Sequence, residues 1–147
     1  PDMAVYGFFD KVVNGDEITV FNNGDLKRDF TYIDDIVDNL QLLLSNRLKL
    51  AQTGNENGYE IYNIGNQSPV KLMEFISLIE KITGKDAKKN FLPMQPGDVY
   101  ETYSDSSKIK KLLSFEYATP LEKGLTAFYK WYLQYHKIET KALQSHE

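Results

Sequence analysis

Arg28 is the residue of this 147-residue sequence whose chemistry points most directly to a ligand. It is the one guanidinium of the stretch 28–35, RDFTYIDD, where aromatic residues alternate along a predicted strand. Guanidinium groups bind phosphate oxygens through paired N–H groups, so this position predicts an anion site. An ion pair with a nearby aspartate explains the same residue equally well. On composition alone both interpretations stay open.

Two further segments could complete a binding site. In residues 93–98, PMQPGD, two prolines stiffen the chain around Gln95 and Asp98. Such a loop can hold a carboxylate at a fixed distance from sugar hydroxyls, although an ordinary rigid connection would have the same composition. The helix expected at the start of the chain exposes backbone N–H groups at Met3 and Ala4. These groups form an anion site unless a cap or water satisfies them.

The sequence holds no convincing catalytic machinery of its own. Its two histidines, His136 and His146, fall at the end of the last expected helix and in the tail, where we expect solvent exposure. It contains no Gly-x-Ser-x-Gly, no Gly-x-Gly-x-x-Gly, no phosphate-loop lysine motif and no histidine pair with metal-ligand spacing. Asp34 and Asp35 are better explained as charges at a helix start than as a general acid and base.

The composition indicates one globular domain, since 41% of the residues are hydrophobic and 13% aromatic. With 17 basic and 21 acidic residues the net charge is −4, which argues against a nucleic-acid partner. The absence of cysteine excludes disulfides, Cys-ligated metals and thiol catalysis, and it fits a cytoplasmic location. No apolar run approaches the roughly 20 residues that a membrane helix needs.

The periodicity predicts an α/β chain with several helices and few short strands. We expect residues 1–137 to form the domain and 138–147 a polar tail. A capping box over 119–122 opens the last helix, whose inner side includes Leu125, Tyr132 and Tyr135. The other helices are expected at 3–13, 34–48, 68–83 and 105–113, and the strands at 18–21, 27–32, 59–64 and 88–92.

Two of these elements look incomplete. The helix over 34–48 carries an apolar stripe that includes Val37, Leu40 and Leu44, and the strand over 59–64 is equally apolar. Few short strands are available to cover them. Either they complete a sheet built by another segment, or copies of the chain associate, so we expect self-association.

Four segments together resemble the C-terminal, substrate-binding part of the extended short-chain dehydrogenase/reductase family. The resemblance is closest to its nucleotide-sugar epimerase branch, the UDP-glucuronate 4-epimerases, and reaches to about residue 137. The segments are PDMA at 1–4, RDFTYIDD at 28–35, YNIGN at 62–66 and PMQPGDV at 93–99. Four such motifs in the right order are specific, although each one alone is modest.

The resemblance implies a role for several residues toward a UDP-sugar. Arg28 would bind the diphosphate, and backbone groups at Met3 and Ala4 would lie beside it. Val20 and Phe21 would line the uracil, partly through their backbone.

It also implies roles within the proline-rich loop. Asp98 would hydrogen-bond the uridine ribose. Gln95 stands where several relatives have an arginine, and a glutamine is typical of the glucuronate branch. Tyr100 and Glu101 depart from the family pattern, which often has a proline and then a small residue at these positions.

The family's catalytic and cofactor motifs are absent from the sequence. None of its ten tyrosines is followed by a lysine four residues later, and no glycine-rich NAD-binding turn is present. The resemblance implies that NAD, bound by an N-terminal half, oxidises the sugar at C4 and returns the hydride to the opposite face. We therefore expect this chain alone to be inactive. A nucleotide-sugar 4,6-dehydratase or decarboxylase, or a non-catalytic binding or assembly module, remains the alternative.

Overall fold

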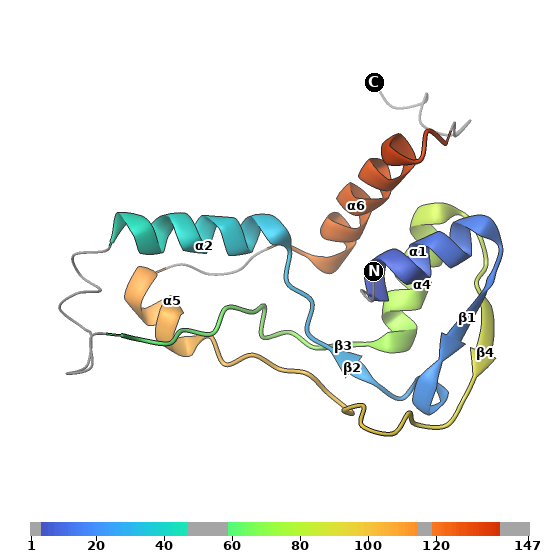
Figure 1. Cartoon of the computed structure of the whole chain (residues 1–147), viewed down its shortest axis with the longest axis horizontal. Coiled ribbons are helices and arrows are strands. Elements are labelled where there is room, and N and C mark those ends of the chain that lie inside the picture. The colour runs from blue at the N-terminus through green and yellow to red at the C-terminus, as the bar shows by residue number, and fades with distance from the viewer. Residues whose placement is uncertain (1–3, 47–58, 115–118, 139–147) are drawn as a thin grey trace.

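A computed structural model describes residues 4–46, 59–114 and 119–138. Two parallel strands form one edge of it, β1 (Glu17–Val20) and β4 (Lys88–Phe91), paired from Glu17↔Lys88 to Val20↔Phe91. Helices α1 (Ala4–Asn14) and α4 (Leu72–Thr83) lie beside this pair, and α6 (Leu121–Tyr135) lies beyond them, against α4 (Figure 1). These elements agree with the predicted α/β class of few strands and several helices.

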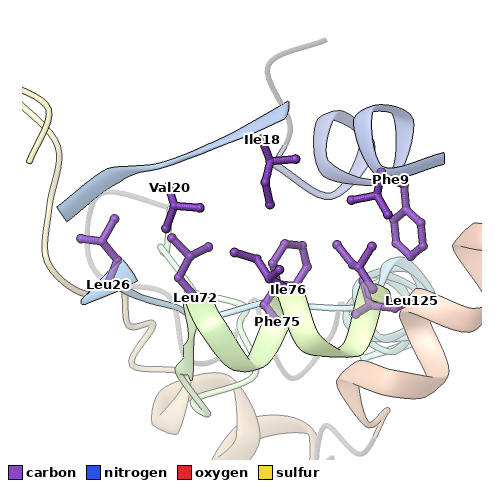
Figure 2. Packing of buried hydrophobic residues seen from close by; sticks show 10 residues of the cluster. Phe9, Ile18, Val20, Leu26, Leu72, Phe75, Ile76 and Leu125 are labelled. Carbon is purple, nitrogen blue, oxygen red and sulfur yellow. The ribbon is translucent and has the colours of Figure 1, made fainter. Parts of the chain in front are cut away.

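The hydrophobic core lies between β1, α1, α4 and α6. α4 follows the predicted pattern, since Phe75, Ile76 and Ile79 are fully buried. Phe75 also stacks on Phe30 with ring centroids 4.7 Å apart. The helix ends where expected, because Gly84 adopts φ 66°, which a residue with a side chain rarely does. Figure 2 shows the packing of Phe9, Ile18, Val20, Leu26, Leu72, Phe75, Ile76 and Leu125.

A second, antiparallel pair consists of β2 (Lys27–Arg28) and β3 (Val70–Lys71). β1 leads into it through a short 3-10 turn, η1 (Phe21–Gly24). The strand predicted over 27–32 is wrong beyond residue 28, because the next backbone N–H donates to a side chain and leaves the ladder. The helix predicted from residue 68 begins only at Leu72, because 70–71 pair with β2 first.

Helix α2 (Ile33–Ser45) lies away from this core, next to α5 (Ser107–Leu113) (Figure 1). Its apolar stripe is exposed: Val37 is 41%, Leu40 49% and Leu44 71% accessible. No described residue of α2 belongs to the core cluster. The buried side of α2 is instead polar, formed by Asp35 and Asn39.

Residues 59–64 do not form the predicted strand. The segment is extended, but within the described part of the chain no strand pairs with it. Tyr59 and Ile61 are 60% and 71% exposed. A strand needs a neighbouring strand to pair with, and the described residues supply none here. The loop predicted at 51–58 lies outside the described residues.

The predicted capping box of α6 is also wrong. Pro120 occupies the cap position without a side-chain bond, and Thr119 Oγ1 donates instead to the buried Asp35 carboxylate at 2.9 Å. Tyr132 is buried as predicted and donates to Asp10 Oδ1 at 2.6 Å, whereas Tyr135 is 66% exposed. Burial and then the hydrogen bond to Asp10 raise the pKa of Tyr132. Of the tail predicted at 138–147, residues 139–147 lie outside the described part.

No helix among the described residues is long and apolar enough to cross a membrane.

Candidate functional site

Arg28 and Asp98, two of the residues predicted to bind ligand, are in direct contact. Arg28 Nη2 donates to Asp98 Oδ1 at 2.7 Å, and both side chains are about three-quarters buried, with 24% and 28% exposure. Arg28 Nη1 donates to the carbonyls of Lys27 at 2.8 Å and Tyr100 at 3.3 Å. The structure thus contains the ion pair of the alternative interpretation, and its partner is the carboxylate predicted to bind the ribose.

The ion pair leaves part of both groups unused. A guanidinium has five N–H donors. Arg28 makes three hydrogen bonds to described residues, two from Nη1 and one from Nη2. Its Nε–H and the second N–H of Nη2 have no acceptor among the same residues. Asp98 Oδ1 also accepts the Val99 N–H at 2.8 Å, and its Oδ2 has no donor among the same residues. The pair can therefore present two donors and one acceptor to a ligand.

The proline-rich loop holds Asp98 by a tight turn. The Asp98 N–H donates to the Gln95 carbonyl at 3.1 Å, and Gly97 between them has φ 83°. The Gln95 side chain is exposed, so its carbonyl shapes the loop while its amide faces outward.

Two residues that sequence reasoning did not assign to the site tie the chain after this loop to β2 and to Asp25, just before it. Tyr100 donates its hydroxyl to Asp25 Oδ1 at 2.9 Å, and Glu101 Oε2 lies 3.1 Å from Lys27 Nζ. The hydrogen bond to Asp25 raises the pKa of Tyr100, and the bond to Glu101 raises that of Lys27. These two positions depart from the family pattern. That departure is the feature of the sequence that could have pointed to their role.

Apart from Gln95, the other predicted site residues that the structure describes make no hydrogen bond to Arg28 or Asp98. Val20 is fully buried in the core, so its side chain cannot reach a ligand, and its carbonyl accepts the Leu92 N–H at 3.0 Å. Phe21 follows it and packs against the core. Ala4 is exposed at the first residue of α1, with no described contact to Arg28. Met3 lies outside the described residues.

An apolar cleft of about 420 Å³ opens elsewhere, between the starts of α1, α2 and α6. None of the predicted site residues lines it. Its walls include the aromatic residues Tyr6, Phe30, Tyr32, Phe128 and Trp131.

The groups considered for catalysis do not assemble. His136 is exposed, as expected, and its Nε2 lies 3.0 Å from the Tyr6 hydroxyl, while His146 is outside the described residues. Asp34 and Asp35 both fall in the first turn of α2, as predicted for helix-start charges. No group of three or more His, Asp or Glu side chains in the described segments is placed to hold a metal ion.

Residues 5–128 match the family described as GDP-mannose 4,6 dehydratase. The chain is 41% identical to protein CapI of Staphylococcus aureus over 146 residues, covering 93% of this chain and 44% of that protein. It is 39% identical to UDP-glucuronate 4-epimerase 1 of Arabidopsis thaliana over 154 residues, covering 99% of this chain and 36% of the relative.

The fold is similar to solved structures that share this sequence similarity. The crystal structure of UDP-glucuronic acid 4-epimerase from Bacillus cereus in complex with UDP-glucuronic acid and NAD matches with a TM-score of 0.77 and 35% identity. The match covers 92% of this chain and 41% of that one. The chain therefore spans less than half the length of each of these relatives.

Proposed function

Because this chain belongs to the extended short-chain dehydrogenase/reductase family, in its branch of nucleotide-sugar epimerases and dehydratases, we propose that it supplies the UDP-sugar-binding side of an NAD-dependent 4-epimerase. It corresponds to the C-terminal portion of those enzymes. The proposed reaction interconverts UDP-glucuronate and UDP-galacturonate. The names of the relatives support this substrate class.

The contact between Arg28 and Asp98 carries the proposal. A diphosphate needs a cation with directed donors, and a ribose needs a fixed acceptor beside it. The guanidinium offers its Nε–H and one Nη2–H to diphosphate oxygens while the carboxylate keeps Oδ1 on Arg28. Asp98 Oδ2 then accepts a ribose hydroxyl. In this arrangement the ion pair is retained and fixes the spacing of the two subsites.

The remaining roles are proposed around this pair. Gln95 is exposed in the same loop, and its amide is proposed to face the diphosphate. Val20 contributes to the uracil pocket through its backbone, since its side chain is buried, and Phe21 through its backbone and ring edge. The first turn of α1, at Met3 and Ala4, contributes backbone N–H groups toward the diphosphate.

The residues of this chain do not fit an NAD site. The sequence has no Gly-x-Gly-x-x-Gly, and the parallel strand β1 runs into the 3-10 turn η1 rather than a glycine-rich turn that opens a helix. We propose that NAD is held by a dinucleotide-binding unit outside these 147 residues. No chemical step is assigned to this chain.

The proposal predicts weak UDP-sugar binding and no turnover by the chain alone. Isothermal titration with UDP-glucuronate, together with a chromatographic assay for UDP-galacturonate, tests both parts. We expect affinity weaker than micromolar and no product. Micromolar binding by the chain alone, or any turnover, would contradict the view that half of the site is contributed by other residues.

A dehydratase is the second candidate, because the matching family is described by that activity. A decarboxylase would bind the same class of substrate. Product analysis of a complete enzyme carrying this segment separates a 4-epimer from a 4-keto-6-deoxy or decarboxylated sugar. A non-catalytic binding or assembly module would give no product at all.

The proposal also covers the bounds of the binding unit, its self-association and its location. We propose that residues 1–137 act as one sugar-nucleotide-binding unit and that 138–147 form a polar tail. We also propose that copies of the isolated chain associate through the exposed stripe of α2. A cytoplasmic location is proposed in keeping with the cysteine-free composition.

A further inference from the structure

Asp29 ties the end of β2 to two other segments of the chain. Its backbone N–H donates to Thr102 Oγ1 at 3.0 Å. Its carboxylate accepts the backbone N–H of Gln67 at 3.0 Å and that of Ser68 at 3.2 Å. β2 itself is only 2 residues long, so these bonds hold the strand where its ladder stops, directly after Arg28.

The partner of the Asp29 carboxylate is a small backbone anion site. Gln67 has φ 60°, in the left-handed region, so its N–H and that of Ser68 turn toward the same acceptor. Successive N–H groups in such a turn form a concavity that favours an anion. A carboxylate fills it with both oxygens, whereas a side-chain amide has only one acceptor oxygen.

Thr102, which accepts the Asp29 N–H, belongs to the segment that supplies acceptors to the Arg28 guanidinium. Thr102 returns a hydrogen bond to the strand, because its N–H donates to the Lys27 carbonyl at 3.3 Å. Two residues before it, the Tyr100 carbonyl accepts both the Lys27 N–H and Arg28 Nη1. The segment that bonds to Asp29 is thus the one that carries the Asp98 and Tyr100 acceptors of Arg28.

We propose that Asp29 is a positioning residue for Arg28: by pinning the end of β2 between 67–68 and Thr102, it aims the guanidinium at the diphosphate. This inference rests on the proposed function, since it concerns how Arg28 meets its ligand. Asp29 does not itself touch the ligand.

The charge of Asp29 makes the direction of the effect informative. A carboxylate near an anion site repels the ligand, so removing its charge should strengthen diphosphate binding if charge were its whole contribution. As a positioning residue, Asp29 has the opposite effect. Replacement by the isosteric Asn should weaken UDP binding even though a negative charge is lost.

NMR titrations of the ¹⁵N-labelled chain with UDP and with uridine test this. We expect Asp29→Asn to weaken UDP binding by about fivefold or more and to leave uridine binding within about twofold. Asp38→Asn removes the same charge from an exposed site on α2 and is expected to change neither. Thr102→Val removes the other anchor and should weaken UDP binding in the same selective way. It carries the test if the amide spectrum shows that Asp29→Asn does not fold.

The possible results distinguish a failure of the positioning role of Asp29 from a failure of the proposed function. UDP binding that is unchanged or tighter, or an equal loss for UDP and uridine, overturns the positioning role while Arg28 keeps its own. Adding Asp29→Asn to Arg28→Ala should cause no further loss of UDP affinity, and a full additional loss also overturns it. Failure of the unmodified chain to bind UDP, or UDP binding that survives Arg28→Ala, overturns the proposed function and this inference with it.

Discussion

Arg28 and Asp98 are 70 positions apart in the sequence and meet through an Nη2–Oδ1 hydrogen bond of 2.7 Å. The strand that carries Arg28 and the proline-rich loop that carries Asp98 are held together by backbone bonds between Lys27 and the segment 100–102. The proposed site therefore forms where these two segments cross. Changes that loosen the crossing should affect binding even where they do not touch a ligand.

Gly65 lies at a close approach next to this crossing. A Cβ at this position would lie 2.3 Å from Ser104 Cβ and 2.7 Å from Ser104 Oγ. We expect Gly65→Ala to lower the free energy of unfolding by about 1–3 kcal/mol, because the segments that carry Gly65 and Ser104 must move apart to admit the methyl group. Urea denaturation measures this change.

Gly7→Ala is the matched control for that substitution. Gly7 lies within α1, and a Cβ there would meet nothing within 4 Å. It should raise the free energy of unfolding by about 0.5–1 kcal/mol through the better helix propensity of alanine. If Gly65→Ala raised the free energy of unfolding as Gly7→Ala does, the close approach at Gly65 would not exist in solution.

Glu80 makes stability depend on pH. Burial alone would raise the pKa of its carboxyl, but hydrogen bonds from Lys89 Nζ and the Ala87 N–H outweigh burial and lower it. A lowered folded-state pKa means that the contribution is complete above the ordinary pKa of glutamate. It is lost as the pH falls through the lowered value.

Glu80→Gln should therefore destabilise the chain by about 1 kcal/mol at pH 7 and by progressively less in acid. Thermal unfolding across the acid range measures the difference. Glu122→Gln breaks the exposed pair with Lys81, whose side chains are 50% and 67% exposed, and should have little effect at any pH. A Glu80→Gln effect that stayed constant down to the acid limit would exclude the ionic contribution.

The stripe on α2 predicts how self-association responds to mutation. Leu40→Lys places a charge in the middle of the exposed residues Ile33, Val37 and Leu44 and should shift assemblies toward monomer. Because Leu40 is 49% exposed, stability should change by less than about 0.5 kcal/mol. Sedimentation velocity measures the shift, with the exposed Gln41→Lys as control. A chain that is already monomeric at high concentration would rule out this surface as a self-association site.

Local signals in the sequence predicted the elements that depend on local chemistry. The end of α4 at Gly84 and its buried residues Phe75 and Ile79 follow from a left-handed cap and a helical apolar period. The pair β1–β4 was also expected as two strands, although its parallel register could not be read from either segment alone.

The errors arose where a distant partner decides the structure. Thr119 leaves the predicted capping box for Asp35, 84 positions away. The predicted strand at 59–64 has the right residues but no strand paired with it among the described residues. In the proposed site, residue types indicate Arg28 and Asp98 separately, while their mutual contact comes from two segments that lie 70 positions apart in the sequence.

Comparing the UDP affinities of Arg28→Ala and the unmodified chain by NMR titration shows whether the Arg28 guanidinium binds the diphosphate. We expect Arg28→Ala to lose about tenfold or more in UDP affinity, since charged hydrogen bonds to the diphosphate are removed, and to lose no affinity for uridine. Lys27→Gln, which neutralises the neighbouring cation paired with Glu101, should retain most of the affinity. Equal UDP affinity in Arg28→Ala and the unmodified chain would show that Arg28 does not bind the diphosphate.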